Sequence, residues 1–223
     1  MLLKWIGPLA LLAVLVVGDQ VRINRPGHKY RLTIEVETPD GLKTGPSLIE
    51  PYFVAQPMIL TTNIGHWSLR GDAPFVDLGH GKKVVALNPR GPTAGDVDTP
   101  VLLAIKAFGV RPCGDFCQWK KISEMSGTRD LPSALLPTLV TVSDVNDLKS
   151  VRAIRPDEFE AVFGPGYRFR CAQIELTNDP ITRGIKKKIP FLVADRNELT
   201  RFRVMRAGVG YVPQLGDFAA AGN

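Results

Sequence analysis

Signatures of catalysis are scarce in this chain of 223 residues. The hydrolase patterns G-x-S-x-G, S-x-x-K and H-E-x-x-H do not occur, and neither does a phosphate loop of the Walker or dinucleotide type. The three histidines have no spacing that suggests a metal site, and three cysteines are too few for a disulfide scaffold. The sequence therefore indicates no metal and no cofactor. An enzyme would need a site assembled from distant segments.

The chain also lacks internal repeats and low-complexity tracts. Charged residues make up 22% of the chain and hydrophobic residues 44%, which is ordinary for a globular protein. This composition excludes wholesale disorder, a collagen-like chain, a coiled coil and a polytopic membrane protein. The length suggests one domain, and 21 glycines with 18 prolines predict many turns and short elements.

The first 18 residues form the strongest local signal. Residues 5–18 carry no charge and follow Lys4, as in the hydrophobic region of a secretory signal. As a helix they would span roughly 21 Å, against about 30 Å for a bilayer core, so a membrane anchor is marginal. We predict that residues 1–18 are a signal anchor or a signal peptide, with retention favoured. The alternative is a buried first helix of the domain, although the run has no polar face.

The charges after this segment disagree with simple export. Arg22, Arg25, Lys29 and Arg31 follow it, against Lys4 before it, and the positive-inside rule would keep the side that holds them in the cytoplasm. The membrane orientation therefore stays open.

The rest of the chain divides into three predicted parts. Residues 19–29 are polar and basic and are typical of a linker. Residues 30–207 are predicted to form a single globular β-rich domain. Residues 208–223 are rich in glycine and alanine and are predicted to be a flexible tail that frays.

Strand signals begin at residue 30. Tyr30, Leu32, Ile34 and Val36 alternate with polar residues, which predicts a half-buried strand, and residues 39–41 predict a turn. Further strands are expected at 47–54 (an edge or broken strand because of Pro51), at 73–78 and 82–87 (a hairpin around 79–81), at 138–143, at 167–177 with a bulge near Cys171 and Ala172, at 189–193 and at 201–205.

Two short helices are expected among these strands. Thr99 is a good N-cap, Pro100 fits the first helical position, and Gly109 stops the helix that they begin. Residues 155–163 predict a second helix, with Phe159, Val162 and Phe163 as its apolar stripe. Residues 110–137 are predicted to be irregular. Together these signals predict an α+β fold, mainly antiparallel β with two or three short helices, after an N-terminal hydrophobic helix.

Several segments carry a resemblance to a known family. They are the strand and turn 30–41, the hairpin segment 75–79, and residues 136–141, 146–147, 155–164 and 179–184. Together they resemble an uncharacterised bacterial family of short proteins with an N-terminal hydrophobic segment, over about residues 1–193. No function of that family is known, so no site residue is carried over. The resemblance implies a membrane-anchored or exported globular domain, periplasmic or at the membrane of a bacterial envelope.

Cys113 and Cys117 have the spacing C-x3-C rather than the redox spacing C-x-x-C. Pro112 and Gly114 favour a turn that would bring the two sulfurs together, and in an oxidising envelope a local disulfide is favoured. The alternatives are two unpaired thiols and a thiol redox centre. Cys171 lies on a predicted strand and is expected in the core.

The main charge feature lies late in the chain. Arg183, Lys186, Lys187 and Lys188 begin a basic stretch, 181–206, with eight basic and two acidic residues. It would suit anionic lipid headgroups, and a solvated hairpin or sheet edge is the alternative. Nucleic acid is not expected, because no aromatic residue is interleaved among residues 181–190.

The acidic run Asp144, Asn146 and Asp147 offers oxygen ligands of the kind that calcium prefers, but a turn capped by these side chains explains it more simply.

The function that best fits the sequence is a non-enzymatic, membrane-associated or periplasmic domain that binds a partner or an anionic surface. The membrane is contacted through residues 1–18, and a protein partner cannot be named. The alternative is an envelope enzyme, either a hydrolase with a spatially assembled site or a thiol oxidoreductase that uses Cys113 and Cys117.

Overall fold

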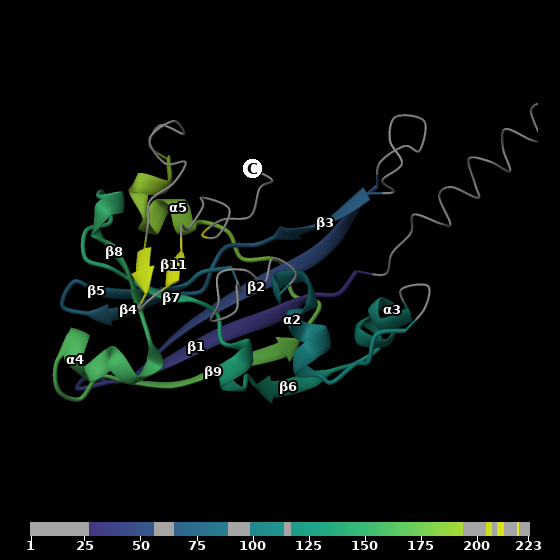
Figure 1. Cartoon of the computed structure of the whole chain (residues 1–223), viewed down its shortest axis with the longest axis horizontal. Helices are drawn as coiled ribbons and strands as arrows, with labels where there is room; N and C mark the ends of the chain where they lie inside the picture. Colours follow the sequence, from purple (N-terminus) through teal and green to yellow (C-terminus); the bar gives the residue numbers. More distant parts are fainter. Residues whose placement is uncertain are drawn as a thin grey trace, which may run out of the picture.

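The computed structural model describes residues 27–55, 65–88, 99–113, 117–193, 204–206, 209–211 and 218 (Figure 1). The hydrophobic segment 1–18 and most of the predicted linker lie outside these ranges. Among the residues that the structure describes, no helix is long and apolar enough to cross a membrane.

Two antiparallel sheets form the body (Figure 1). The larger sheet has the strand order β3-β2-β1-β9-β6, and the smaller has the order β4-β5-β7-β8. A two-stranded ribbon, β10 and β11, has contacts with β8. The bounds are β1 Tyr30–Thr38, β2 Gly41–Ala55, β3 Gly65–Arg70, β4 Phe75–Gly79, β5 Lys82–Ala86, β6 Gly127–Asp130, β7 Leu139–Val142, β8 Val151–Ile154, β9 Arg168–Leu176, β10 Val204–Arg206 and β11 Val209–Tyr211.

The helices are short and lie between these strands. The α-helices are α2 Thr99–Ala107, α3 Cys117–Ser123, α4 Phe159–Phe163 and α5 Ile185–Lys188, and the 3-10 helices are η2 Ser133–Leu135, η3 Leu148–Ser150, η4 Pro156–Glu158 and η5 Pro190–Val193. The predicted α+β fold with mainly antiparallel strands and few short helices is thus confirmed. The predicted N-terminal helix falls outside the described residues.

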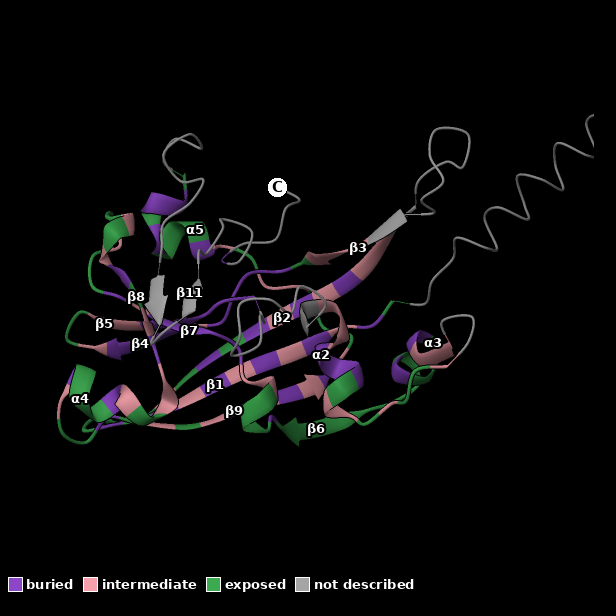
Figure 2. Ribbon diagram, in the orientation of Figure 1, coloured by how far each residue is buried: buried purple, intermediate pink, exposed green. Residues whose placement is uncertain are grey.

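The strand β1 shows the predicted alternation. Tyr30, Leu32, Ile34 and Val36 are fully buried, while the residues between them are half-buried (Figure 2). The strand β2 is longer than expected, because Pro51 does not break it. It pairs with β1 up to Ile49 and then with β3 from Glu50 onward.

The two sheets approach closely where β2 passes β4. A Cβ placed on Gly45 would lie 2.5 Å from the carbonyl oxygen of Phe75 and 2.7 Å from Cγ2 of Val76. Only glycine permits this distance between the backbones, so Gly45 sets the spacing of the sheets at this point.

The smaller sheet is buried on both faces. Val84 and Ala86 join the core that the two sheets share with α2, whereas Val85 and Leu87 face a second core. That second core is covered by α5, by η5 and by Phe218. Phe218 is 1% exposed, its ring lies 5.9 Å from that of Phe191, and its carbonyl accepts a hydrogen bond from Ala73 N. The expectation of a fraying tail therefore does not describe Phe218.

The predicted bulge in β9 is present. Glu35 pairs with Cys171 and Val36 pairs with Phe169, so Arg170 has no partner across from it in β1. The extra residue moves Ala172, Ile174 and Leu176 onto the buried face.

Three expectations are corrected, and one strand is new. Residues 110–137 are not irregular throughout, because they contain α3, η2 and the edge strand β6. Residues 189–193 end in the 3-10 helix η5 rather than forming a strand. The strand β8 was not expected. Val162 is 50% exposed, so the buried stripe of α4 consists of Phe159 and Phe163.

Candidate functional site

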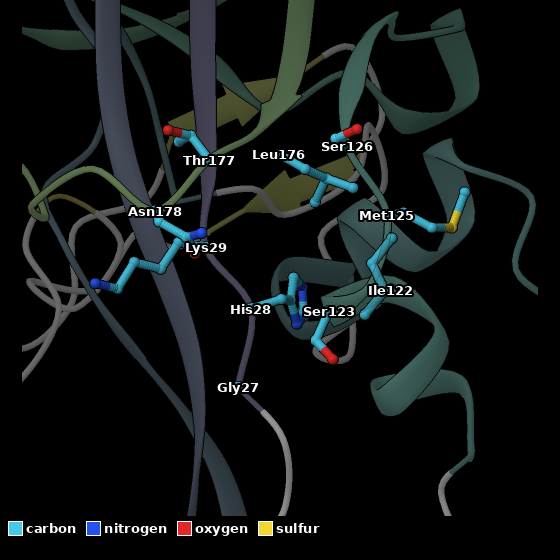
Figure 3. Close-up of a pocket in the computed structure, with 10 residues that line it drawn as sticks. All are labelled: Gly27, His28, Lys29, Ile122, Ser123, Met125, Ser126, Leu176, Thr177 and Asn178. Atoms are coloured by element: carbon cyan, nitrogen blue, oxygen red, sulfur yellow. The ribbon is translucent and has the colours of Figure 1, made fainter.

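A small pocket lies where β1 begins (Figure 3). It has a volume of about 110 Å³, which corresponds to a few water molecules. Three segments form it: the residues that lead into β1, the end of α3 with the turn after it, and the end of β9. The lining residues are Gly27, His28, Lys29, Ile122, Ser123, Met125, Ser126, Leu176, Thr177 and Asn178.

The floor of the pocket is buried and its rim is exposed. His28, Ile122 and Leu176 are at most 9% exposed. The rim carries hydroxyl and amide groups from Ser123, Ser126, Thr177 and Asn178. Among the lining residues that the structure describes, none is acidic and Lys29 alone has a charged side chain. Figure 3 shows the Lys29 side chain extended away from the His28 ring.

His28 is the unusual residue of this site. Its side chain is 6% exposed overall, yet neither Nδ1 nor Nε2 has a hydrogen-bond partner. Burial lowers the pKa of His28 to about 4, so the imidazole is neutral at neutral pH. A neutral imidazole has one donor and one acceptor nitrogen, and leaving both unpaired in a buried position costs free energy.

An aromatic stack holds the imidazole in place. The His28 ring lies 5.7 Å from that of Trp119 and 6.2 Å from that of Tyr30. Trp119 stacks in turn on Trp67 at 3.9 Å, and Trp67 meets Phe53 edge-on at 5.4 Å. The stack joins α3 to the β2–β3 hairpin, and the indole Nε1 of Trp119 is also buried without a partner.

A disulfide tethers the start of α3. Cys113 and Cys117 are joined, with their Cα atoms 5.6 Å apart. Cys117 is the first residue of α3, and the side chain of Gln118 accepts a hydrogen bond from Cys113 N. The same helix supplies Trp119, Ile122 and Ser123 to the region of the pocket, so the disulfide limits the motion of one pocket wall.

The basic stretch lies elsewhere. The run Lys186, Lys187 and Lys188 is exposed on α5, whose first residue, Ile185, is buried. The buried carboxylate of Asp72 accepts a hydrogen bond from Ile185 N at 2.9 Å and fixes this turn. Figure 1 shows α5 on the opposite side of the molecule from α3, which forms one wall of the pocket. These lysines therefore lie on a helix, and not on the hairpin or sheet edge that the sequence suggested as an alternative. Arg183 is also exposed, two residues before α5.

Two other candidate regions have simpler roles. His80 contacts Asp40 at 3.2 Å, but both side chains are mostly exposed at the tips of two hairpins. The side chain of Asp144 accepts a hydrogen bond from Asn146 N, and that of Asp147 accepts one from Lys149 N, each at 2.8 Å. These two hydrogen bonds form the side-chain-capped turn that the sequence favoured over a calcium site. Within the described ranges, no group of three or more histidine, cysteine or acidic residues is arranged to hold a metal.

Cys171 lies on the half-exposed face of the larger sheet, not in the core. The bulge in β9 puts it there beside Glu35, and its thiol donates to Oε2 of Glu35 at 3.5 Å. Burial and the negative charge of Glu35 raise the pKa of the Cys171 thiol to about 11, which makes it a poor nucleophile at neutral pH.

Sequence reasoning missed His28, because the polar and basic composition of residues 19–29 predicts a linker. The alternation of buried and half-buried residues along β1 nevertheless indicates that His28 is buried. Counting back by two from Tyr30 reaches His28, which shares its buried face. Lys29 also belongs to the body, since its carbonyl accepts a hydrogen bond from Thr177 N.

Comparisons with known protein families, with curated proteins and with solved structures found no match to this chain. The arrangement of its own residues therefore carries the functional argument.

Proposed function

We propose that this chain is a non-enzymatic binding domain of a bacterial envelope, attached to or exported across the membrane through residues 1–18, with its binding site at the His28 pocket. The observation that carries the binding role is the imidazole of His28, buried beside a pocket with both nitrogens unpaired. Buried polar groups are nearly always paired, so an unpaired imidazole beside a hollow is a candidate ligand contact. Each nitrogen exposes less than 1 Å² here, so the contact requires the ring to turn towards the pocket.

Two further observations support the location. Residues 5–18 are uncharged and apolar, and the C-x3-C pair forms a disulfide, a bond that persists in oxidising compartments. The pocket also lies where the chain continues to the hydrophobic segment, since Gly27 and His28 line it. Residues 19–26 extend over at most about 28 Å, so a retained anchor would hold the pocket near the membrane.

The exposed lysines of α5 support a second, weaker contact in the same proposal. Lys186, Lys187 and Lys188 would add about 1 kcal/mol each next to an anionic bilayer. Their position on the opposite side of the molecule from α3 makes them a separate contact from the pocket.

A thiol oxidoreductase is the alternative that one observation favours. Cys117 is the first residue of α3 and is joined to Cys113, so reduction would release two neighbouring thiols. A catalytic disulfide would exchange with small thiols within minutes, whereas a structural one would resist. A hydrolase has less support, because none of the described residues that line the His28 pocket is acidic.

Cell fractionation with thiol labelling tests this proposal. The full chain is expected in the membrane or periplasmic fraction, with Cys113 and Cys117 protected from alkylation until a strong reductant is added. Recovery in the cytosol with both thiols alkylated at once would contradict the envelope location. Rapid exchange with millimolar glutathione would favour the oxidoreductase.

A further inference from the structure

We propose that the His28 pocket binds a neutral, hydroxyl-bearing ligand: a polyol or one sugar residue, whose hydroxyl groups bond to the polar rim and, once the ring turns towards the pocket, to the imidazole of His28, whose nitrogens each expose less than 1 Å² in the ligand-free fold. This inference deepens the proposed binding function and rests on it. Four properties of the pocket lead to the ligand class: the pairing capacity of the imidazole, the chemistry of the rim, the charge of the lining and the volume.

The imidazole favours a group that both donates and accepts. A neutral histidine presents one N–H and one bare nitrogen, and either can be Nδ1 or Nε2. A hydroxyl group satisfies whichever nitrogen it meets. A carboxylate can only accept and an ammonium group can only donate, so each suits one nitrogen only.

The rim has the same dual character. Ser123, Ser126 and Thr177 carry hydroxyl groups, and Asn178 carries an amide, so every rim side chain in this set both donates and accepts. Ser123 already donates to the carbonyl of Lys120 at 2.8 Å, which leaves its oxygen as an acceptor for a ligand.

The charge of the lining argues against ionic ligands. A cation would lack a counter-charge, because none of the lining residues that the structure describes is an aspartate or glutamate. Among the described lining residues an anion would have Lys29 as its one cation, and the Lys29 side chain extends away from the His28 ring in Figure 3. A neutral ligand requires no such partner and avoids the cost of burying a charge.

The size of the pocket limits the ligand. About 110 Å³ holds a molecule of glycerol's size or one side of a sugar ring, with Ile122 and Leu176 as an apolar floor for its C–H groups. So few contacting atoms predict a Kd on the order of millimolar for a single sugar.

NMR of the histidine side chains tests this inference directly, because the chain has three histidines. The full chain, labelled with ¹⁵N-histidine in a phosphocholine detergent that contains no sugar, is titrated with glycerol, glucose and N-acetylglucosamine. Acetate, phosphate and methylammonium serve as charged probes. We expect a saturable shift of the His28 ring resonances with at least one polyol and none with the charged probes.

Matched variants assign the signal. H28F is expected to abolish the response, and H80F is expected to keep it, since His80 is exposed on a distant hairpin. N178A alters an exposed rim residue without disturbing the core and is expected to weaken binding at least threefold, which gives a test even if H28F does not fold.

Two results would overturn the inference. Saturation by acetate or phosphate, with no response to polyols, would refute the ligand class and leave a binding function in place. No response to any probe up to 100-fold above about 1 mM would refute the ligand class as well, and the cellular location would then be judged separately by fractionation.

Discussion

The pH dependence of stability is the sharpest consequence of the buried imidazole. The pKa of His28 falls from 6.5 to about 4 on folding, because burial disfavours the charged form. Between those values the unfolded chain binds a proton that the folded chain does not. The contribution is therefore fully present above pH 6.5 and is lost as the pH falls towards 4.

The magnitude follows from the two values. A tenfold change in equilibrium corresponds to about 1.4 kcal/mol, so the difference between 6.5 and about 4 amounts to about 3 kcal/mol. Most of this loss is expected by pH 4.5. The ring faces Trp119 and Tyr30, which are neutral in this range.

The comparison of wild type with H28F isolates this residue from the carboxylates that titrate over the same interval. Phenylalanine keeps a ring in the stack and removes both unpaired nitrogens, so H28F is expected within about 1 kcal/mol of wild type at pH 7.5. Urea unfolding, followed by the fluorescence of Trp67 and Trp119, gives the free energy of unfolding at each pH. Wild type should lose about 3 kcal/mol more than H28F between pH 7.5 and 4. Parallel pH profiles of the two proteins would refute the reasoning.

Four further predictions concern other parts of the fold. G45A is expected to cost about 2–3 kcal/mol in urea unfolding, because its Cβ would meet the backbone of Phe75 at 2.5 Å. G27A, whose Cβ meets nothing within 4 Å, should be neutral, and an equal effect of the two would contradict this account. The double variant C113S/C117S should lose about 2 kcal/mol for its short loop; no change after reduction of wild type would contradict this. W119A should lose about 3–5 kcal/mol and release α3, seen as faster amide exchange at Ile122; unchanged exchange there would refute the role of the stack. K186Q/K187Q/K188Q should leave stability within about 0.5 kcal/mol and lower the affinity for phosphatidylglycerol vesicles at least tenfold; unaltered vesicle binding would remove the lipid contact.

The parts of the fold that follow from local patterns were predictable. The alternation of Tyr30, Leu32, Ile34 and Val36 specifies one buried face, and it can do so because a strand presents residues to its two faces in turn. Thr99 and Gly109 bracket α2 in the same local way.

Elements without a local pattern were not predictable. The strand β6 has four exposed residues and is a strand only because β9 supplies its hydrogen bonds. The helix α3 has two buried residues, Trp119 and Ile122, and depends on the packing of distant aromatic rings for its place. Phe218 likewise covers the second core through contacts with residues as distant in sequence as Ala73.

The candidate site divides in the same way. The position of His28 on the buried face was available from the alternation of β1. The pocket beside His28 was not predictable, because its other walls come from residues 122–126 and 176–178. These lie about 100 and 150 positions further along the chain. Which polar groups surround an imidazole is a property of the tertiary fold.

The most direct test of the central claim is the pKa of the His28 imidazole, read from its ring resonances during a pH titration of the full chain. The buried and unpaired ring described above predicts a midpoint at about 4. A midpoint at 6 or above would mean that the ring is hydrated or has a charged partner, and the argument for the pocket as a binding site would fail with it.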